Sequence, residues 1–330
     1  MNSVARAHSL RRGRRARNRG VRRALVGAVA AVGLSAAAWW WTRSRAPYVA
    51  SWRRSSLPLR TDRALPARVG GSGDPTFLVL HGVGTTADCF GAGFDRLAEH
   101  GRVVMPDLLG FGRAMDSTRD HFDVVDHLKA LDETVRELGS GGPVVVVGHS
   151  LGGALALRWA AHNVDQVAGV VAWGPPLYLD GDRARAEISG AMQRAVAIDT
   201  DLAAWLCARM CRYRRIAAAI AVMSSPATPS VLARQAVLHT WPAYRDALRH
   251  VAFDTGWTSA LQTLNDRGVP VRLVWGFEDR IGDPDAIAAL ATTMSNVEIV
   301  RVPGDHRAPL IDPGGAVDEI VAIANSSNIA

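Results

Sequence analysis

Residues 144–162 read VVVVGHSLGGALALRWAAH, and they decide the fold. The four consecutive β-branched residues at 144–147 are typical of a strand that is buried on both faces of a parallel sheet. Residues 151–162 follow as a helix rich in small and apolar side chains. The pentapeptide Gly-His-Ser-Leu-Gly at 148–152 joins the two, and its glycines allow a tight strand-to-helix turn. We therefore expect Ser150 to present its hydroxyl at the carboxyl edge of a sheet.

Strand-like and helical segments alternate on both sides of this turn. Short apolar runs predict strands, and Phe122–Leu138 predicts an amphipathic helix because its apolar residues recur at spacings of four and three. Such alternation builds a mostly parallel sheet that helices cover on both faces. The predicted strands are Thr76–Leu80, Arg102–Met105, Val144–Val147, Val167–Trp173, Val269–Trp275 and Val297–Val302, and the other predicted helices are Leu151–His162, Pro284–Met294 and Asp312–Ile323.

The stretch from about residue 174 to residue 266 interrupts the alternation. It is rich in helical patterns and contains no obvious strand. A long insertion between two strands predicts a helical lid above the carboxyl ends of the strands, where open α/β sheets bind ligands. The large apolar residues of this region are expected either to line the pocket or to form the core of the lid itself; they include Trp173, Trp205, Met223 and Trp241.

The turn at Ser150 and the segments around it resemble the α/β-hydrolase family over roughly residues 70–325. The resemblance implies an α/β-hydrolase fold with an inserted helical lid, and Ser150 as the nucleophile. Members of this family carry their catalytic residues in the chain order serine, acid, histidine. Residues 275–279 read Trp-Gly-Phe-Glu-Asp and match the family's Trp-Gly-x-x-Asp pattern, so the expected acid is Asp279. Glu278 and Asp283 are alternatives close by in the sequence.

The base of the family lies in a loop at the carboxyl end of a strand, and His306 follows Val297–Val302 in such a loop. A serine hydroxyl is a weak nucleophile near neutral pH and needs a base within hydrogen-bond reach. We therefore expect His306 to take the proton of Ser150 and Asp279 to orient the imidazole. The other downstream histidines fall in the helix after the turn or in the expected lid: His162, His239 and His250.

A mechanism of this kind needs two backbone N–H groups that stabilise the oxyanion. The resemblance assigns them to Leu151, directly after the nucleophile, and to Val83, in the loop after the first predicted strand. His81 is expected to order that loop, and His149, at the variable position of the turn, is expected to be structural. Residues 106–113 read PDLLGFGR and resemble the family's Pro-Asp-x-x-Gly-x-Gly loop, which is also expected to be structural.

These residues together predict a serine hydrolase that cleaves a carboxylic ester through an acyl-enzyme, with no metal or organic cofactor. Other reactions stay open, because carbon–carbon bond hydrolases, cofactor-free haloperoxidases and acyltransferases of the family use the same triad. A fold-retaining binding or scaffold protein is the alternative from a different class. An apolar lid next to a membrane segment favours a small-molecule ester of hydrophobic or lipid-like character.

The net charge of +7 is concentrated near the amino terminus. Residues 1–23 carry nine arginines and no acidic residue, and residues 43–68 carry seven arginines against Asp62. Residues 69–330 are therefore left with a net charge of about −8. A basic tail on an acidic body argues against nucleic acid as a partner and is typical of segments that meet anionic lipid.

Residues 24–41 form an uncharged run that ends in three tryptophans. As a helix this run would extend about 27 Å, just short of a bilayer core of about 30 Å, and indoles favour the membrane–water boundary. The preference of basic residues for the cytoplasmic side predicts a membrane anchor with an extracytoplasmic body. Two alternatives are a twin-arginine-like export signal, built on Arg22-Arg23 with a cleavage site at 36–38, and a soluble helix on a cytoplasmic protein.

The expected organisation is a basic disordered tail at 1–23, a transmembrane or signal segment at 24–42, a linker at 43–69 and an α/β-hydrolase domain at 70–330. Three cysteines predict no disulfide framework. Two of them share a helix face, where small buried residues are favoured over a bridge or a metal pair because no further ligand lies nearby in the sequence. The cysteines are Cys89, Cys207 and Cys211.

Overall fold

The structure is a computed structural model that describes residues 35–62, 64–180 and 201–326. The expected basic tail and residues 24–34 of the expected membrane segment lie outside the described residues, as do residues 181–200 of the expected lid. Residues 35–45 are helical. Within the described part of the chain, no helix combines the length and the apolar character that crossing a bilayer requires.

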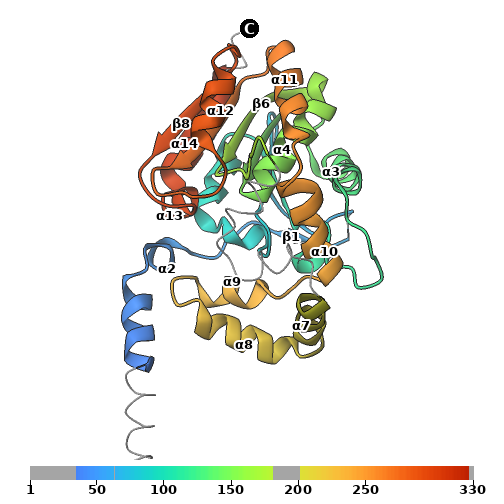
Figure 1. Cartoon of the computed structure of the whole chain (residues 1–330). Coiled ribbons are helices and arrows are strands. Elements are labelled where there is room, and N and C mark those ends of the chain that lie inside the picture. Colours follow the sequence, from blue (N-terminus) through green and yellow to red (C-terminus); the bar gives the residue numbers. More distant parts are fainter. Residues whose placement is uncertain (1–34, 63, 181–200, 327–330) are drawn as a thin grey trace, which may run out of the picture.

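An eight-stranded sheet forms the centre of the molecule (Figure 1). Its strands are β1 (Leu59–Arg60), β2 (Ala67–Gly70), β3 (Thr76–Leu80), β4 (Arg102–Pro106), β5 (Val144–His149), β6 (Val167–Trp173), β7 (Val271–Gly276) and β8 (Val297–Val302). The spatial order is β1-β2-β4-β3-β5-β6-β7-β8. All pairs from β4 to β8 are parallel, and only β1 and β2 join antiparallel. The α/β-hydrolase fold with a mostly parallel sheet is therefore confirmed, and all six predicted strands are present.

Much of the segment expected as a linker, residues 43–69, is instead part of the folded domain. β1 and β2 extend the sheet, and α2 (Pro47–Ser51) packs on the body through the buried side chain of Tyr48. The sequence analysis did not predict β2, because the strand is short and its charged residue Arg68 is buried. The guanidinium of Arg68 lies 2.6 Å from the buried carboxylate of Asp88, a pairing that only the tertiary structure provides.

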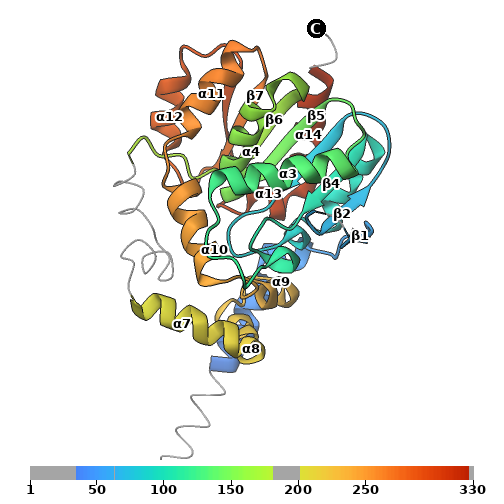
Figure 2. The same cartoon turned by 90° about the vertical axis from the view of Figure 1, so that its right-hand side faces the viewer.

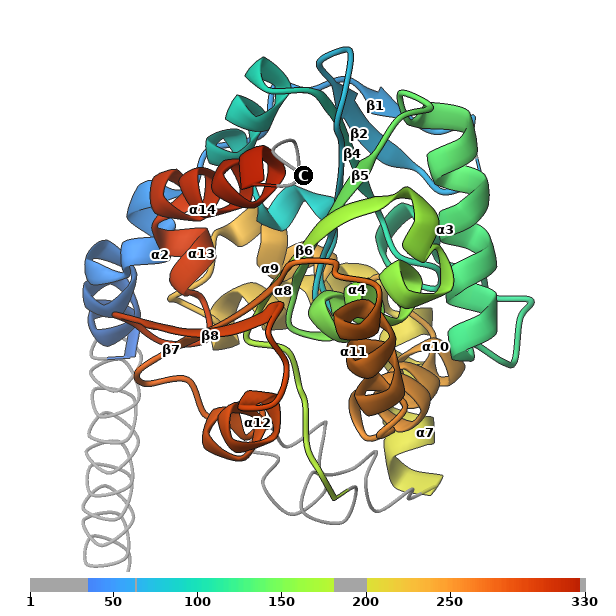
Figure 3. The same ribbon diagram turned by 90° about the horizontal axis from the view of Figure 1, so that it is seen from above.

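Helices cover both faces of the sheet, as the buried strands require. Seen from above, α3, α4 and α11 lie on one side of the strands and α14 lies on the other (Figure 3). α3 begins two residues later than predicted because Asp123 caps it. The Asp123 side chain accepts the Asp126 N–H, and the Asp126 side chain accepts the Asp123 N–H in return. The bounds are α3 (Val124–Leu138), α4 (Leu151–His162), α11 (Trp257–Asp266), α12 (Pro284–Ala291), α13 (Ala308–Ile311) and α14 (Pro313–Ser326), with short helical turns η1 (Ala87–Cys89), η2 (Ala92–Glu99), η3 (Gly112–Ala114) and η4 (Val164–Gln166).

The helices of the expected lid lie between β6 and β7. They are α7 (Asp201–Arg212), α8 (Arg214–Ser224), α9 (Ser230–Gln235) and α10 (Trp241–Asp246), followed by the π-helical turn η5 (Ala247–Ala252). Figure 1 and Figure 2 place α7, α8 and α9 at the end of the molecule where the helix at 35–45 leaves the body. α11 falls in the same sequence range, but it packs on α4 in the helix layer.

Candidate active site

Ser150 lies in a strained turn between β5 and α4. Its φ of 57° and ψ of −125° make it the only non-glycine residue with a positive φ among the described residues. Such conformations cost about 1–3 kcal/mol and persist where the surrounding structure imposes them. Here the Ser150 N–H donates to the Trp173 carbonyl at 2.8 Å. A Cβ at Gly152 would lie 2.2 Å from the Leu80 carbonyl oxygen, so only glycine lets α4 approach β3 this closely.

Asp279 and His306 meet beside this turn, because β7 and β8 are neighbours and both residues lie in the loops after these strands. His306 Nδ1 lies 2.9 Å from Asp279 Oδ2. The Asp279 side chain is only 1% exposed, and its other oxygen accepts the Ile281 N–H at 2.9 Å. A carboxylate can only accept, so the proton is on His306 Nδ1. In the neutral imidazole, Nε2 is then the nitrogen with the lone pair that can accept a proton.

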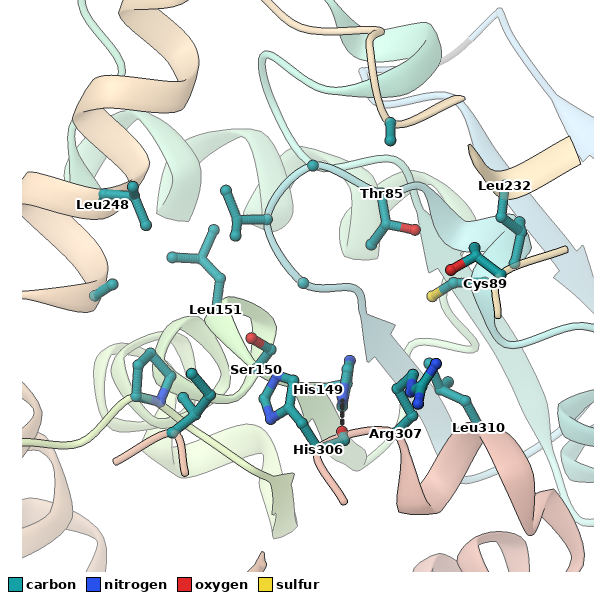
Figure 4. Close-up of a pocket in the computed structure, with 18 of the residues that line it drawn as sticks. Thr85, Cys89, His149, Ser150, Leu151, Leu232, Leu248, His306, Arg307 and Leu310 are labelled. Atoms are coloured by element: carbon teal, nitrogen blue, oxygen red, sulfur yellow. Dashed lines mark hydrogen bonds between the residues drawn. The ribbon is translucent and has the colours of Figure 1, made fainter. Parts of the chain in front are cut away.

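One pocket of about 350 Å³ brings the predicted residues together, since Ser150, His306, Val83 and Leu151 all line it. In Figure 4 a ring nitrogen of His306 faces the Ser150 side chain. Among the described residues no hydrogen bond joins the two side chains, and catalytic contacts of this kind often tighten only when substrate binds. Leu151 is the first residue of α4, where backbone N–H groups lack an intrahelical partner.

Buried hydrogen bonds fix the loop that carries Val83. His81 donates from Nδ1 to the Gly82 carbonyl at 2.8 Å and accepts the Leu108 N–H at Nε2, also at 2.8 Å. Burial lowers the pKa of His81, which keeps the ring neutral and able to serve both partners. The Asp107 carboxylate also accepts the Ala87 N–H, which joins the two loops by a further hydrogen bond. His81 orders this loop, as expected.

The expected lid contributes to the pocket wall and is hydrogen-bonded to the body. Leu232 and Ala233 of α9 line the pocket, and Gln235 of the same helix fastens the lid to the body. Gln235 donates to Asp88 at 2.6 Å and accepts from the Thr86 hydroxyl at 2.9 Å. Burial raises the pKa of Asp88, but hydrogen bonds from Gln235 and two arginines outweigh it and hold the pKa at about 2. The carboxylate that receives the lid is therefore charged at neutral pH.

Two features of the pocket differ from the expectations. Tyr48 of α2 lines it and donates its hydroxyl to the Cys89 carbonyl at 2.8 Å, although no local pattern marks residue 48 as part of a site. Trp205 and Met223, expected to line the pocket or to form the core of the lid, are 53% and 63% exposed. The pocket walls consist mainly of smaller residues of α9, η5 and the loops around Ser150.

The three cysteines form no disulfide in the described part of the chain, although the thiols of Cys207 and Cys211 interact with each other. Cys89 and Cys207 are buried, Cys211 is half-buried, and all three are free thiols. Cys211 Sγ donates to the His239 carbonyl. In the described ranges, no group of three or more His, Cys, Asp or Glu residues is placed to hold a metal ion.

Comparison with known proteins finds a family that the chain matches. A model described as the alpha/beta hydrolase family matches residues 77–320. The chain is 41% identical over 128 residues to Lipase LipV of Mycobacterium tuberculosis, a match that covers 38% of this chain and 46% of that relative. It is 25% identical over 270 residues to a pimeloyl-acyl-carrier-protein methyl ester esterase of Yersinia enterocolitica, with 78% and 96% of the two chains covered. The aligned part thus spans less than half of the lipase.

Solved structures share the fold at low sequence identity. The crystal structure of E-2-(acetamidomethylene)succinate hydrolase superposes with a TM-score of 0.61 at 21% identity and covers 82% of this chain and 99% of that one. A thermophilic esterase from Thermogutta terrifontis superposes with a TM-score of 0.56 at 22% identity, with 80% and 93% covered. At these identities the likeness extends to the fold alone.

Proposed function

Because the chain belongs to the α/β-hydrolase family, we propose that it is a serine hydrolase that cleaves carboxylic esters with Ser150, His306 and Asp279. One observation carries the proposal: a strained serine shares its pocket with a histidine whose Nδ1 is held by a buried carboxylate. The partial similarity to a lipase and to a methyl ester esterase supports an ester as the substrate.

In the proposed reaction His306 Nε2 takes the hydroxyl proton while Ser150 Oγ attacks the ester carbonyl carbon. The N–H groups of Val83 and Leu151 stabilise the negative oxygen, each contributing about 3 kcal/mol. His306 then gives its proton to the leaving alcohol, and the acyl-enzyme forms. A water molecule, deprotonated by His306, attacks the acyl carbon and releases the acid, which restores Ser150. Asp279 stabilises the imidazolium in both halves.

The pocket favours an uncharged, apolar substrate of modest size. Its volume of about 350 Å³ lies at the lower end of the range for small-molecule sites, which is about 300–1,000 Å³. Arg307, the residue after the proposed base, contributes a charged side chain to the pocket wall. Its guanidinium forms an ion pair with the Asp305 carboxylate at 2.7 Å. A substrate carboxylate would therefore have to compete with Asp305, whereas an alkyl chain meets Leu232, Leu248 and their neighbours.

A panel of p-nitrophenyl esters of increasing chain length, run beside a dienone substrate for carbon–carbon bond cleavage, tests the proposal. We expect ester turnover by the full-length chain and its loss in Ser150→Ala. Turnover of the dienone but of no ester would favour the carbon–carbon hydrolase. A Ser150→Ala variant that retains both activities would refute the assigned nucleophile. A parent chain that turns over none of these substrates would favour a binding or scaffold role.

We also propose a membrane location with an extracytoplasmic body. The arginine-rich tail, the uncharged run at 24–41 and the exposed Trp40 and Trp41 support it. α7 and α8, at the same end of the molecule, expose further large apolar side chains, including Leu202, Ile216, Ile220 and Met223. Protease treatment of intact spheroplasts should digest the body of a tagged full-length chain. Protection of the body until lysis would favour the cytoplasmic alternative, and a shortened chain in the medium would favour a cleaved export signal.

A further inference from the structure

His149, the residue before the nucleophile, contacts the loop that carries the base. Its Nε2–H donates to the main-chain carbonyl of His306 at 2.7 Å, the contact drawn as a dashed line in Figure 4. The two imidazole rings also pack face to face at a tilt, with 4.8 Å between centroids and 39° between planes. His149 is buried, so water does not compete for these contacts. His149, which the sequence predicts to be structural, thus makes both a hydrogen bond and a ring contact with the proposed base.

The surroundings of His149 keep its ring neutral and in one tautomer. Burial, and then the nearby His306, lower the pKa of His149 to about 3. A neutral imidazole has one proton, and the His306 carbonyl requires that proton on Nε2. His149 Nδ1 is buried without a hydrogen-bond partner among the described residues, so no second acceptor draws the proton away. A neutral neighbour also adds no positive charge beside His306 when His306 accepts the serine proton.

Besides His149, two other contacts hold His306 in place. Asp279 holds Nδ1 at 2.9 Å. The backbone of Gly174, at a φ of +51°, packs so close that a Cβ there would lie 2.6 Å from Asp279 Oδ2 and 2.8 Å from His306 Nδ1. These two contacts fix the ring on its Asp279 side, whereas the bond from His149 fixes the backbone of residue 306.

We propose that His149 is a positioning residue that ties the loop of His306 to the turn of Ser150. His149 and Ser150 are consecutive residues, so the bond to the His306 carbonyl couples the base directly to the nucleophile's own backbone. Catalytic groups must be held to within about 0.5 Å, and a misplacement of about 1 Å can cost about 10²-fold in rate. This inference rests on the proposed function and adds a residue to its site.

Two substitutions in the full-length chain separate the hydrogen bond from the ring. His149→Phe keeps a buried ring but removes the donor, and His149→Gln keeps an amide N–H near the position of Nε2 but removes the ring. We expect kcat for an ester to fall by about tenfold or more in the Phe variant with KM nearly unchanged, and to stay within about threefold of the parent in the Gln variant. His127→Phe is the matched control, because His127 is a buried histidine on α3 whose ring makes no hydrogen bond among the described residues.

A fluorophosphonate labelling rate and the downfield proton NMR signal of His306 Nδ1–H provide readouts that a purely structural role would not move. The signal should broaden in the Phe variant and be retained in the Gln variant. A Phe variant with the parent's kcat and labelling rate would overturn the inference, and so would a Gln variant as impaired as the Phe variant. If the Phe variant does not fold, the Gln variant decides alone. A parent chain that is not labelled at all would instead overturn the proposed function, and this inference with it.

Discussion

Replacement of Asp279 by asparagine tests the acid of the site with the least change in shape. One Asp279 oxygen accepts the Ile281 backbone N–H and the other accepts His306 Nδ1–H, each at 2.9 Å. Because the backbone donor cannot change, the new amide keeps its oxygen on Ile281 and turns its NH₂ group toward His306. Nδ1 must then accept, so the imidazole proton moves to Nε2. Nε2 is the atom that has to accept the proton of Ser150.

The expected loss is large because nothing in the site replaces the carboxylate. Its side chain is 1% exposed, so water cannot supply a compensating acceptor. The same change in a serine-protease triad leaves the geometry intact and lowers kcat by about 10⁴-fold, which corresponds to about 5 kcal/mol of barrier. We expect a loss of that order here, with little change in melting temperature because the shape of the side chain is retained.

The assay is kcat for the ester that the parent hydrolyses best, measured beside a thermal melt of each variant. Glu278→Gln is the matched control, because this exposed neighbour was an alternative acid in the sequence, whereas the described structure pairs His306 with Asp279. A tenth or more of the parental kcat in Asp279→Asn, or an equal loss in Glu278→Gln, would refute the assignment of the acid.

Three further outcomes follow from the same contacts. Ser150→Gly should raise the free energy of unfolding by about 1 kcal/mol relative to Ser150→Ala, because glycine relieves the positive φ; urea titration measures it, and a less stable glycine variant would argue against strain. Burial lowers the pKa of His127 to about 4, so between pH 6.5 and 4 the unfolded chain binds a proton that the native state does not. Acidification over this range therefore costs about 3 kcal/mol of stability. His127→Phe should reduce the fall of melting temperature with pH over this range, and an unchanged slope would contradict the prediction. A chain of residues 35–330 should fold and one of residues 70–330 should not melt cooperatively, since the latter lacks Tyr48 and β2; circular dichroism distinguishes them, and equal melts would restore the linker interpretation.

Much of the fold could be predicted because its decisive signals are local. A run of valines buried on both faces marks β5, and the strand-to-helix turn after it marks Ser150. The acid and the base follow β7 and β8, and parallel neighbouring strands deliver their carboxyl-end loops to one place. For this reason the sequence alone predicts that residues far apart in the chain meet in one site.

What the sequence analysis missed depends on partners that are distant in the chain. β2 contains Arg68, and the ion pair with Asp88 compensates its buried charge. Tyr48 reaches the pocket only because α2 folds back on the body. His149 occupies the variable position of the turn, and its contact with the His306 carbonyl appears only when β5 and the loop after β8 are placed together.

Chemical labelling can locate the nucleophile of the proposed site. The full-length chain is treated with a fluorophosphonate, digested, and mapped by mass spectrometry. We expect a single adduct on Ser150, which is absent from Ser150→Ala and forms much more slowly in His306→Ala. An adduct on another residue, or one that persists in Ser150→Ala, would contradict this expectation.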